Sequence, residues 1–268
     1  MIMPAQLVPL SSSADWNATV RPALHAKASF DADLLLTAIQ ADTTDPTRFE
    51  LKSLWTELCL GQCKVVESIF TESRCLLVTR AVSSPVALHG TKLGVLQAIL
   101  EGVSQKAIAL ELSVAPSTVA SHARFALEHL GFRQRPSQVP PLLMLAAKAA
   151  RDPATTPEAR VSFIASAGDQ LRVVSAVRPD LDFDLIPPAE FSVLQRIVEG
   201  WPYADIARHR GTSTRTIANQ LTAVFRRLRV SGRRELILRL YQLCADAGAA
   251  HAAGSGLRRR EVWASSVF

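Results

Sequence analysis

The stretch that decides the fold is residues 193–230, which read VLQRIVEGWPYADIARHRGTSTRTIANQLTAVFRRLRV. A first helix is expected over 189–199, because its apolar residues recur at helical spacing and Gly200 then interrupts the pattern. A second, short helix ends at Gly211, and a third runs over 215–229. Two helices joined by a tight turn that contains glycine form the helix-turn-helix pattern of DNA-reading proteins.

The third of these helices is predicted to have two distinct faces. Ser213 or Thr214 is placed to cap its first turn. At 100° per residue, one face carries a stripe of apolar residues, namely Ile217, Leu221, Val224 and Leu228. The opposite face carries Arg215, Asn219, Thr222 and Arg226, with the small Ala218 at its edge. Guanidinium and amide groups on such a face suit phosphate contacts and hydrogen bonds to base edges in a major groove.

A related stretch lies 98 residues earlier in the chain, so that Val95 corresponds to Val193. Without a gap, identical residues recur at this offset, and in the earlier stretch they are Val95, Leu96, Gln97, Ile99, Glu101, Gly102, Ile108, Ala109, Thr118, Ala120 and Leu130. Two unrelated helical segments would rarely agree at so many spaced positions. The chain is therefore predicted to contain a duplicated structural unit.

Both stretches resemble the DNA-binding domain of LuxR-type regulators of the NarL/FixJ class. In the second unit the resemblance covers about 186–245 and rests on Leu194 to Gly200, Ile206-Ala207, Thr216-Ile217, Leu228 to Arg233 and Glu235-Leu236. In the first unit it covers 88–132 and rests on Val95-Leu96, Glu101-Gly102, Ser104 to Lys106, Ile108-Ala109, Ser117 to Val119, His122 and Leu130 to Phe132. The resemblance implies a four-helix domain whose third helix enters the major groove and whose fourth often forms a dimer contact.

The predicted outward face and the resemblance together select the candidate DNA-binding residues. In the second unit these are Arg215, Thr216, Ala218, Asn219, Thr222, Arg226, Arg227 and Arg233. The family pattern usually has a basic residue directly after its Thr-Val pair, whereas this chain has Ala218 and Ala120 there. The target sequence of relatives therefore cannot be carried over to this chain.

The first unit is expected to bind DNA less well than the second. It is neutral overall, and it carries Glu128 where the second unit carries Arg226. A glutamate at that place would repel phosphates. Weaker DNA contact is predicted through Ser117, Thr118, Ser121, His122 and Arg124, and the alternative is a purely structural role.

The rest of the chain is organised around the two units. A β-hairpin is predicted before each helical block, from Cys63–Phe70 with Arg74–Val82 and from Val161–Ala167 with Leu171–Val177. The expected fold class is mainly α with small β-hairpins (α+β), a tandem duplication in which each hairpin precedes a four-helix LuxR-type helix-turn-helix. The expected division is a loosely ordered arm (1–46) with one helix near 31–41, a first unit (47–150), a linker (151–160), a second unit (161–245) and a mobile basic tail (246–268).

The placement of charge supports a polyanionic partner for the second unit. The whole chain has a formal net charge of +6. Residues 190–239 hold 10 Lys and Arg residues against 4 Asp and Glu residues, which is already +6. Charge concentrated in one short segment is the electrostatic footprint expected for double-stranded DNA, although an acidic protein partner would have the same requirement.

Other classes of protein are not expected. The chain has no glycine-rich phosphate loop and no zinc-protease or hydrolase motif, so neither an enzyme nor a cofactor site is predicted. Cys59, Cys63 and Cys75 lack a fourth metal ligand at suitable spacing and are expected to be reduced thiols. No apolar run is long enough to span a membrane and the N-terminus lacks a signal-peptide pattern, so a cytoplasmic location is expected.

Two hypotheses about function follow. The first is a sequence-specific transcription regulator that reads double-stranded DNA with the helix 215–229, as a pseudo-dimer within one chain or as a homodimer. The second is a protein-interaction module or anti-regulator, which uses the helix-turn-helix scaffold to bind RNA polymerase or another regulator. The neutral first unit and the alanine after Thr216-Ile217 favour the second hypothesis.

Overall fold

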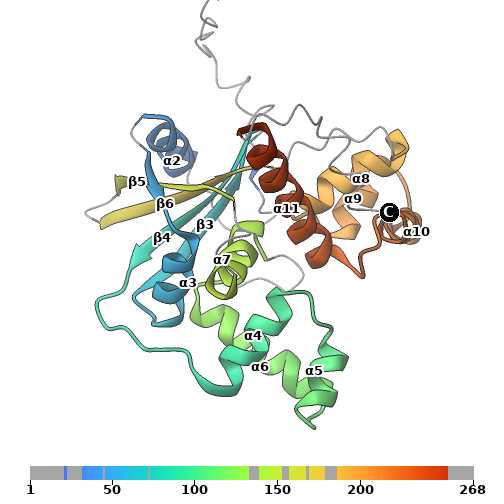
Figure 1. Ribbon diagram of the computed structural model, residues 1–268, viewed down its shortest axis with the longest axis horizontal. Coiled ribbons are helices and arrows are strands. Elements are labelled where there is room, and N and C mark those ends of the chain that lie inside the picture. The colour runs from blue at the N-terminus through green and yellow to red at the C-terminus, as the bar shows by residue number, and fades with distance from the viewer. Residues whose placement is uncertain are drawn as a thin grey trace, which may run out of the picture.

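The computed structural model describes residues 21–22, 32–44, 46–71, 73–132, 139–152, 157–166, 169–178 and 186–252. Its centre is one six-stranded antiparallel sheet, with helices on both faces and two helical modules at its side (Figure 1). The strands are β1 (Arg21–Pro22), β2 (Thr47–Phe49), β3 (Cys63–Phe70), β4 (Arg74–Ala81), β5 (Ala159–Ser166) and β6 (Asp169–Val177).

The helices divide into two supporting helices and two modules. The supporting helices are α2 (Ala32–Thr44) and α3 (Leu51–Cys59). We call α4 (Gly90–Leu100), α5 (Gln105–Glu111), α6 (Pro116–His129) and α7 (Pro141–Arg151) the first module. We call α8 (Pro188–Val198), α9 (Tyr203–Arg210), α10 (Thr214–Arg227) and α11 (Arg233–Ala252) the second module.

The sheet joins the two predicted hairpins into one structure. Its strand order is β1-β3-β4-β6-β5-β2, so β3 pairs with β4, β5 pairs with β6, and β4 pairs with β6 between them. An isolated two-stranded hairpin is only marginally stable in water, because its edges and faces are exposed. Pairing through β4 and β6, which we call the central seam, satisfies one edge of each hairpin.

The central seam has a two-fold relation that matches the sequence repeat. Leu76 lies opposite Ser175, and Leu77 lies opposite Val174. A shift of 98 residues takes Leu76 to Val174 and Leu77 to Ser175, so it exchanges these two pairs. Duplicated units that meet in this way are related like the subunits of a two-fold dimer.

The two faces of the sheet pack against different helices, as the alternation of side chains along a strand requires. On one face, Ala38 of α2 packs in a cluster with Leu76 and Val78 of β4 and with apolar residues of β3, β5 and β6. On the other face, Cys75 and Leu77 of β4 belong to a larger cluster that includes residues of α3, α7 and α11. The fourth helix of each module is therefore packed into the core.

The backbones of the two modules repeat each other in detail. Three positions with a left-handed backbone conformation recur in both modules, and each is 98 residues from its counterpart. The pairs are Gly102 (φ 96°) and Gly200 (φ 92°), Ser113 (φ 53°) and Gly211 (φ 62°), and Gly131 (φ 99°) and Arg229 (φ 52°). The duplication predicted from side chains is thus also present in the path of the backbone.

The structure confirms the predicted fold class, since a hairpin precedes each set of helix-turn-helix helices. The helix expected near 31–41 is present as α2, and α11 continues past the boundary expected at residue 245. Residues 253–268 of the predicted tail, and Gly168 of the predicted second turn, lie outside the described residues. Within the described part of the chain, no helix combines the length and apolarity needed to cross a membrane.

Candidate nucleic-acid interface

The turn between α9 and α10 is built from local backbone signals. Gly211 ends α9 in the left-handed conformation, which glycine adopts at least cost. The N–H groups of Gly211 and Thr212 both donate to carbonyls of α9. Ser213 then caps α10, because its Oγ accepts a hydrogen bond of 3.1 Å from the N–H of Thr216. Of the two predicted cap residues, Ser213 and Thr214, it is the serine that makes this bond.

The predicted apolar stripe holds α10 in the module. Its four residues are all buried, and they are Ile217, Leu221, Val224 and Leu228. They belong to one cluster with apolar residues of α8 and α9, among them Val193 and Ile206. Because this side faces the core, the opposite side of α10 is turned outward.

The outward face of α10 is open and basic. Its exposed residues are Arg215, Thr216, Asn219, Thr222, Arg226 and Arg227, while Ala218 is half-buried. Among the described residues, neither the side chain of Arg215 nor that of Arg226 has a hydrogen-bond or ion-pair partner. These two guanidinium groups and the amide of Asn219 are therefore exposed to solvent.

Two residues of this face make contacts inside the module. The hydroxyl of Thr222 donates to the carbonyl of Ala218 at 2.9 Å, which leaves its oxygen lone pairs as acceptors. Nη1 of Arg227 lies 2.5 Å from Oε2 of Glu190 on α8. The side chain of Arg227 is still 40% exposed. Its charge is partly compensated by Glu190, so it is a weaker candidate for a phosphate contact than Arg215 or Arg226.

Arg233, which the sequence analysis places among the candidate DNA-binding residues, is half-buried. Its Nε and Nη2 atoms are inaccessible to solvent and have no hydrogen-bond partner among the described residues. Burial, together with the charge of Arg234, lowers the pKa of Arg233 to about 10. The side chain begins α11 and packs against Gly200, at the end of the α8 segment. We therefore leave Arg233 out of the proposed interface.

Arg229 is a candidate that the sequence reasoning missed. It is exposed, it follows the last turn of α10, and its side chain has no partner in the described part of the chain. On a helix it would lie about 120° from Ile217, at the border of the outward face, so the same angular test could have included it. Arg226 and Arg229 place two free cations at the C-terminal end of the interface.

The equivalent helix of the first module presents a different face. Its inward residues Val119, Ala123, Ala126 and Leu127 are buried. Ser117, Ser121, Arg124 and Glu128 are exposed, while Thr118 and His122 are half-buried. Arg124 and Glu128 stand one helical turn apart with opposite charges. The surface of α6 is therefore close to neutral, in contrast to α10.

The residues that precede α6 are also apolar, whereas the equivalent residues that precede α10 include two arginines. Leu110, Leu112 and Val114, around the end of α5, are 82%, 41% and 36% exposed. The positions 98 residues later hold Arg208, Arg210 and Thr212. Arg208 pairs with Asp205 at 2.9 Å, and Arg210 donates to the carbonyl of Ala189 at 2.6 Å. Around this turn the first module thus carries exposed apolar side chains, and the second module carries basic ones.

Comparison with protein families agrees with this geometry. The model of bacterial regulatory proteins of the luxR family matches the chain twice, over residues 90–139 and over residues 187–240. The first match spans α4 to α6, and the second spans α8 to α10 and the first part of α11. Searches of curated proteins and of solved structures return no match. The chain thus carries two tandem LuxR-type helix-turn-helix modules, a domain of bacterial regulatory proteins.

Proposed function

We propose that this protein is a transcription regulator that binds double-stranded DNA sequence-specifically, with α10 in the major groove. LuxR-type modules are typically found in DNA-binding regulators rather than in enzymes. The observation that carries the proposal is the outward face of α10, on which Arg215, Asn219 and Arg226 are exposed above a buried apolar stripe. This arrangement presents hydrogen-bonding groups to a groove while the core holds the helix.

The order of groups along α10 assigns them different roles. Arg215 and Asn219 lie in the N-terminal half of the helix, where recognition helices contact base edges. Arginine can form two hydrogen bonds with guanine, and asparagine can do the same with adenine. Arg226 and Arg229 lie at the other end, where a guanidinium suits backbone phosphates. We propose that the first pair reads sequence and the second pair fixes the register of the helix on DNA.

The first module is proposed to be chiefly a structural partner of the second. Its helix α6 is anchored to the sheet, because the N–H of Val65 in β3 donates to the carbonyl of Leu130 at 2.8 Å. Its residues Ser117, Ser121 and Arg124 are exposed and could add weaker DNA contacts. The neighbouring Glu128 opposes such contacts electrostatically.

The contact between the fourth helices favours an internal pseudo-dimer over a homodimer. α7 and α11 pack in the same core cluster, and Nζ of Lys148 donates to Oε1 of Gln242 at 3.0 Å. In relatives the fourth helix often forms the contact between two chains, whereas in this chain that contact is made between the two modules. We propose that the molecule binds DNA as one chain, with its stronger reader in the second module.

Selection of bound sites from a random duplex library tests the proposal. The expected result is one strongly specified half-site, read by α10. A second, weakly specified half-site about one helical turn away would support direct contact by the first module. Affinity for a random duplex should fall steeply as salt increases, because phosphate contacts release counterions. Failure to bind any duplex at low salt would overturn the proposal.

A protein-interaction role is the second candidate, and the exposed apolar residues Leu110, Leu112 and Val114 favour it. Exposed apolar side chains that gather at one turn are more typical of protein contacts than of DNA contacts. In this version α10 would bind an acidic surface of RNA polymerase or of another regulator. Binding to such a protein, together with the absence of duplex binding at low salt, would favour this candidate.

A further inference from the structure

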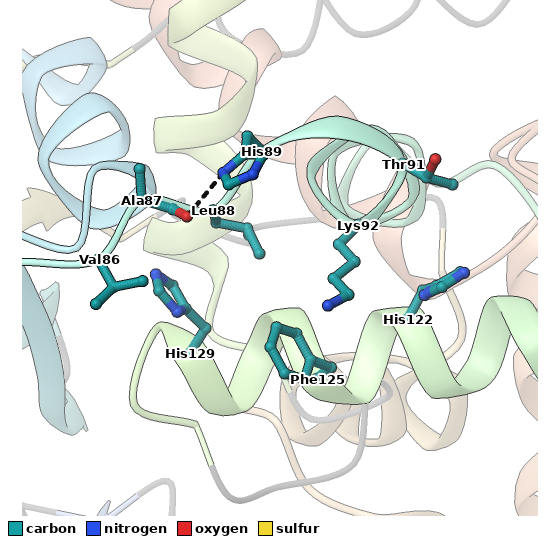
Figure 2. Close-up of a pocket in the computed structure, with 9 residues that line it drawn as sticks. All are labelled: Val86, Ala87, Leu88, His89, Thr91, Lys92, His122, Phe125 and His129. Carbon is teal, nitrogen blue, oxygen red and sulfur yellow. Dashed lines mark hydrogen bonds between the residues drawn. The ribbon is translucent and has the colours of Figure 1, made fainter.

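The first module contains a pocket that the DNA-binding proposal does not use. It has a volume of about 430 Å³ and lies between the start of α4 and the flank of α6 (Figure 2). His122, Phe125 and His129 come from successive turns of α6, and Lys92 reaches toward them from α4. Its size is within the range of pockets that hold small organic molecules.

The polar lining of this pocket is cationic or neutral. Nζ of Lys92 lies 3.7 Å from the centre of the Phe125 ring and makes a cation–π contact with its face. His89, His122 and His129 also line the pocket. None of the described lining residues carries a carboxylate. A ligand with a negative charge would therefore meet several hydrogen-bond donors and no acidic side chain.

The second module has an ion pair at the place equivalent to this pocket. Lys92 corresponds to Glu190, and His129 corresponds to Arg227, both at the offset of 98 residues. In the second module these two positions form an ion pair of 2.5 Å. In the first module they hold two basic groups, which cannot neutralise each other. The negative charge that the second module supplies from its own chain is missing from the first.

His129, which lines the pocket, has one ring nitrogen without a hydrogen-bond partner among the described residues. Its Nε2 is inaccessible to solvent and has no hydrogen-bond partner among the described residues. Desolvation is the largest cause that lowers its pKa, followed by the charge of Lys64, while a hydrogen bond with the backbone of Val86 opposes the shift. A buried polar atom without a partner is unfavourable unless a ligand or water completes its hydrogen bonding. The ring of His89, by contrast, is held by the carbonyl of Ala87 at 3.0 Å (Figure 2).

We propose that this pocket binds a small organic anion, whose acidic group pairs with Lys92 and the histidines and whose apolar body lies against Phe125 and Val86. The apolar part of the lining is the reason for an organic ligand rather than a bare inorganic ion. The ligand supplies the negative charge that Glu190 supplies in the second module. Binding would hold the start of α4 against α6.

Histidine ring resonances in a proton–carbon NMR titration of the full chain test this site, with benzoate as the probe. The chain has 6 histidines, of which His89, His122 and His129 line the pocket and the other three serve as internal references. Benzoate should shift the pocket histidines saturably and leave the references unchanged. Benzamide has the same shape without the charge. Its affinity should be at least about tenfold lower than that of benzoate, because it lacks the charge-assisted contacts.

Two lysine variants form a matched pair for the same titration. Lys92→Glu installs the residue type that the second module has at this position, so the variant is expected to fold, and it should weaken benzoate binding about tenfold. Lys106→Glu makes the same charge change at an exposed position of α5 outside the pocket, and it should leave benzoate binding unchanged. Phe125→Ala, which also introduces the second module's residue, should weaken binding of the apolar body.

Three results would overturn the proposal. Equal binding of benzoate and benzamide would show that charge is not recognised. Equal losses in Lys92→Glu and Lys106→Glu would show a general electrostatic effect. Shifts of the pocket histidines caused by a short random duplex, with no effect of benzoate, would assign the pocket to DNA phosphates instead. The benzoate results do not depend on whether α10 reads DNA, so the two proposals fail separately.

Discussion

The two modules share a backbone but expose different surfaces. Residues with a left-handed backbone recur at the same three places, and α6 and α10 each bury a stripe of apolar residues. Outside the core, the basic face of α10 corresponds to a nearly neutral face on α6, and Arg208 and Arg210 correspond to Leu110 and Leu112. Core residues and turn conformations preserve the fold after duplication, while exposed positions are free to take another role. A family match alone therefore does not assign the same activity to both modules.

The largest expected difference in stability between equivalent variants concerns Gly131 and Arg229, which lie two residues after the ends of α6 and α10. A Cβ on Gly131 would lie 2.3 Å from the carbonyl oxygen of Val65, at a φ of 99°. Gly131→Ala should therefore lower the free energy of unfolding by about 3 kcal/mol, from overpacking and backbone strain together. The equivalent Arg229→Ala should change it by less than about 0.5 kcal/mol, since Arg229 is exposed. Urea unfolding measures both values, and similar losses would contradict the different anchoring of the two modules.

DNA affinity should distinguish the two outward faces. Arg215→Ala or Asn219→Ala should cost about 1–3 kcal/mol of binding free energy on the selected site, because each removes a group proposed to contact a base edge. Arg124→Ala is the matched change in α6 and should cost much less. Fluorescence anisotropy with a labelled duplex gives these values. If Arg124→Ala costs as much as Arg215→Ala, the ranking of the modules is wrong.

Substitutions at the equivalent turn residues Ser113 and Gly211 should change the free energy of unfolding in opposite directions. Ser113 adopts a left-handed φ of 53° where the second module has Gly211. Ser113→Gly should stabilise the chain by about 1 kcal/mol, and Gly211→Ala should destabilise it by about the same amount, because a Cβ disfavours this conformation. Nothing lies within 4 Å of a Cβ on Gly211, so no steric clash adds to the effect. Thermal unfolding of the two variants checks the signs, and a common sign would contradict the argument.

The helix caps offer a smaller reciprocal test. Ser213 caps α10 through its hydroxyl, whereas the equivalent Ala115 caps α6 without a side-chain hydrogen bond. Ser213→Ala should cost about 1 kcal/mol of stability, and Ala115→Ser should add about 0.5 kcal/mol. Ser104→Ala removes a similar cap from α5 and serves as a comparison. A loss on Ala115→Ser would indicate that α6 begins with a different backbone geometry.

The smallest expected effect is a difference in acid sensitivity at one equivalent position. Burial lowers the pKa of His129 below its ordinary value, so the folded state favours the neutral ring. As the pH falls below about 6.5, the unfolded chain binds this proton more readily, and stability decreases. His129→Gln should reduce the stability lost between pH 7 and pH 5, measured by urea unfolding at each pH. Arg227→Gln is the matched change at the equivalent position of the second module, and it should leave the pH dependence between pH 7 and pH 5 unchanged.

Much of the fold could be predicted because its signals are local. The bounds of β3 follow from a short apolar run, and the α9–α10 turn follows from Gly211 and a serine or threonine cap. The exposed and buried sides of α10 follow from helical periodicity alone. These features depend on residues within one or two turns of each other, so the sequence contains them directly.

Other features depend on contacts between distant residues and could not be predicted. Strand periodicity predicts two hairpins, but it does not say that β4 pairs with β6. Nε and Nη2 of Arg233 are buried because α11 packs near Gly200. The sequence gives no sign of this packing, so it does not distinguish Arg233 from an exposed basic residue. The pocket beside Lys92 arises where α4 meets α6, so its lining is visible only in three dimensions.

The central seam also has a consequence for how the chain is made. Arg74 of β4 pairs with Val177 of β6, so the ribosome completes β4 roughly 5–20 s before its partner strand is available, at ordinary elongation rates. During that interval the growing polypeptide has an unpaired strand edge, which is a template for wrong association. This edge can be paired only once β6 has emerged, and β6 precedes α10 in the chain, so the sheet can form before the basic helix of the second module is made.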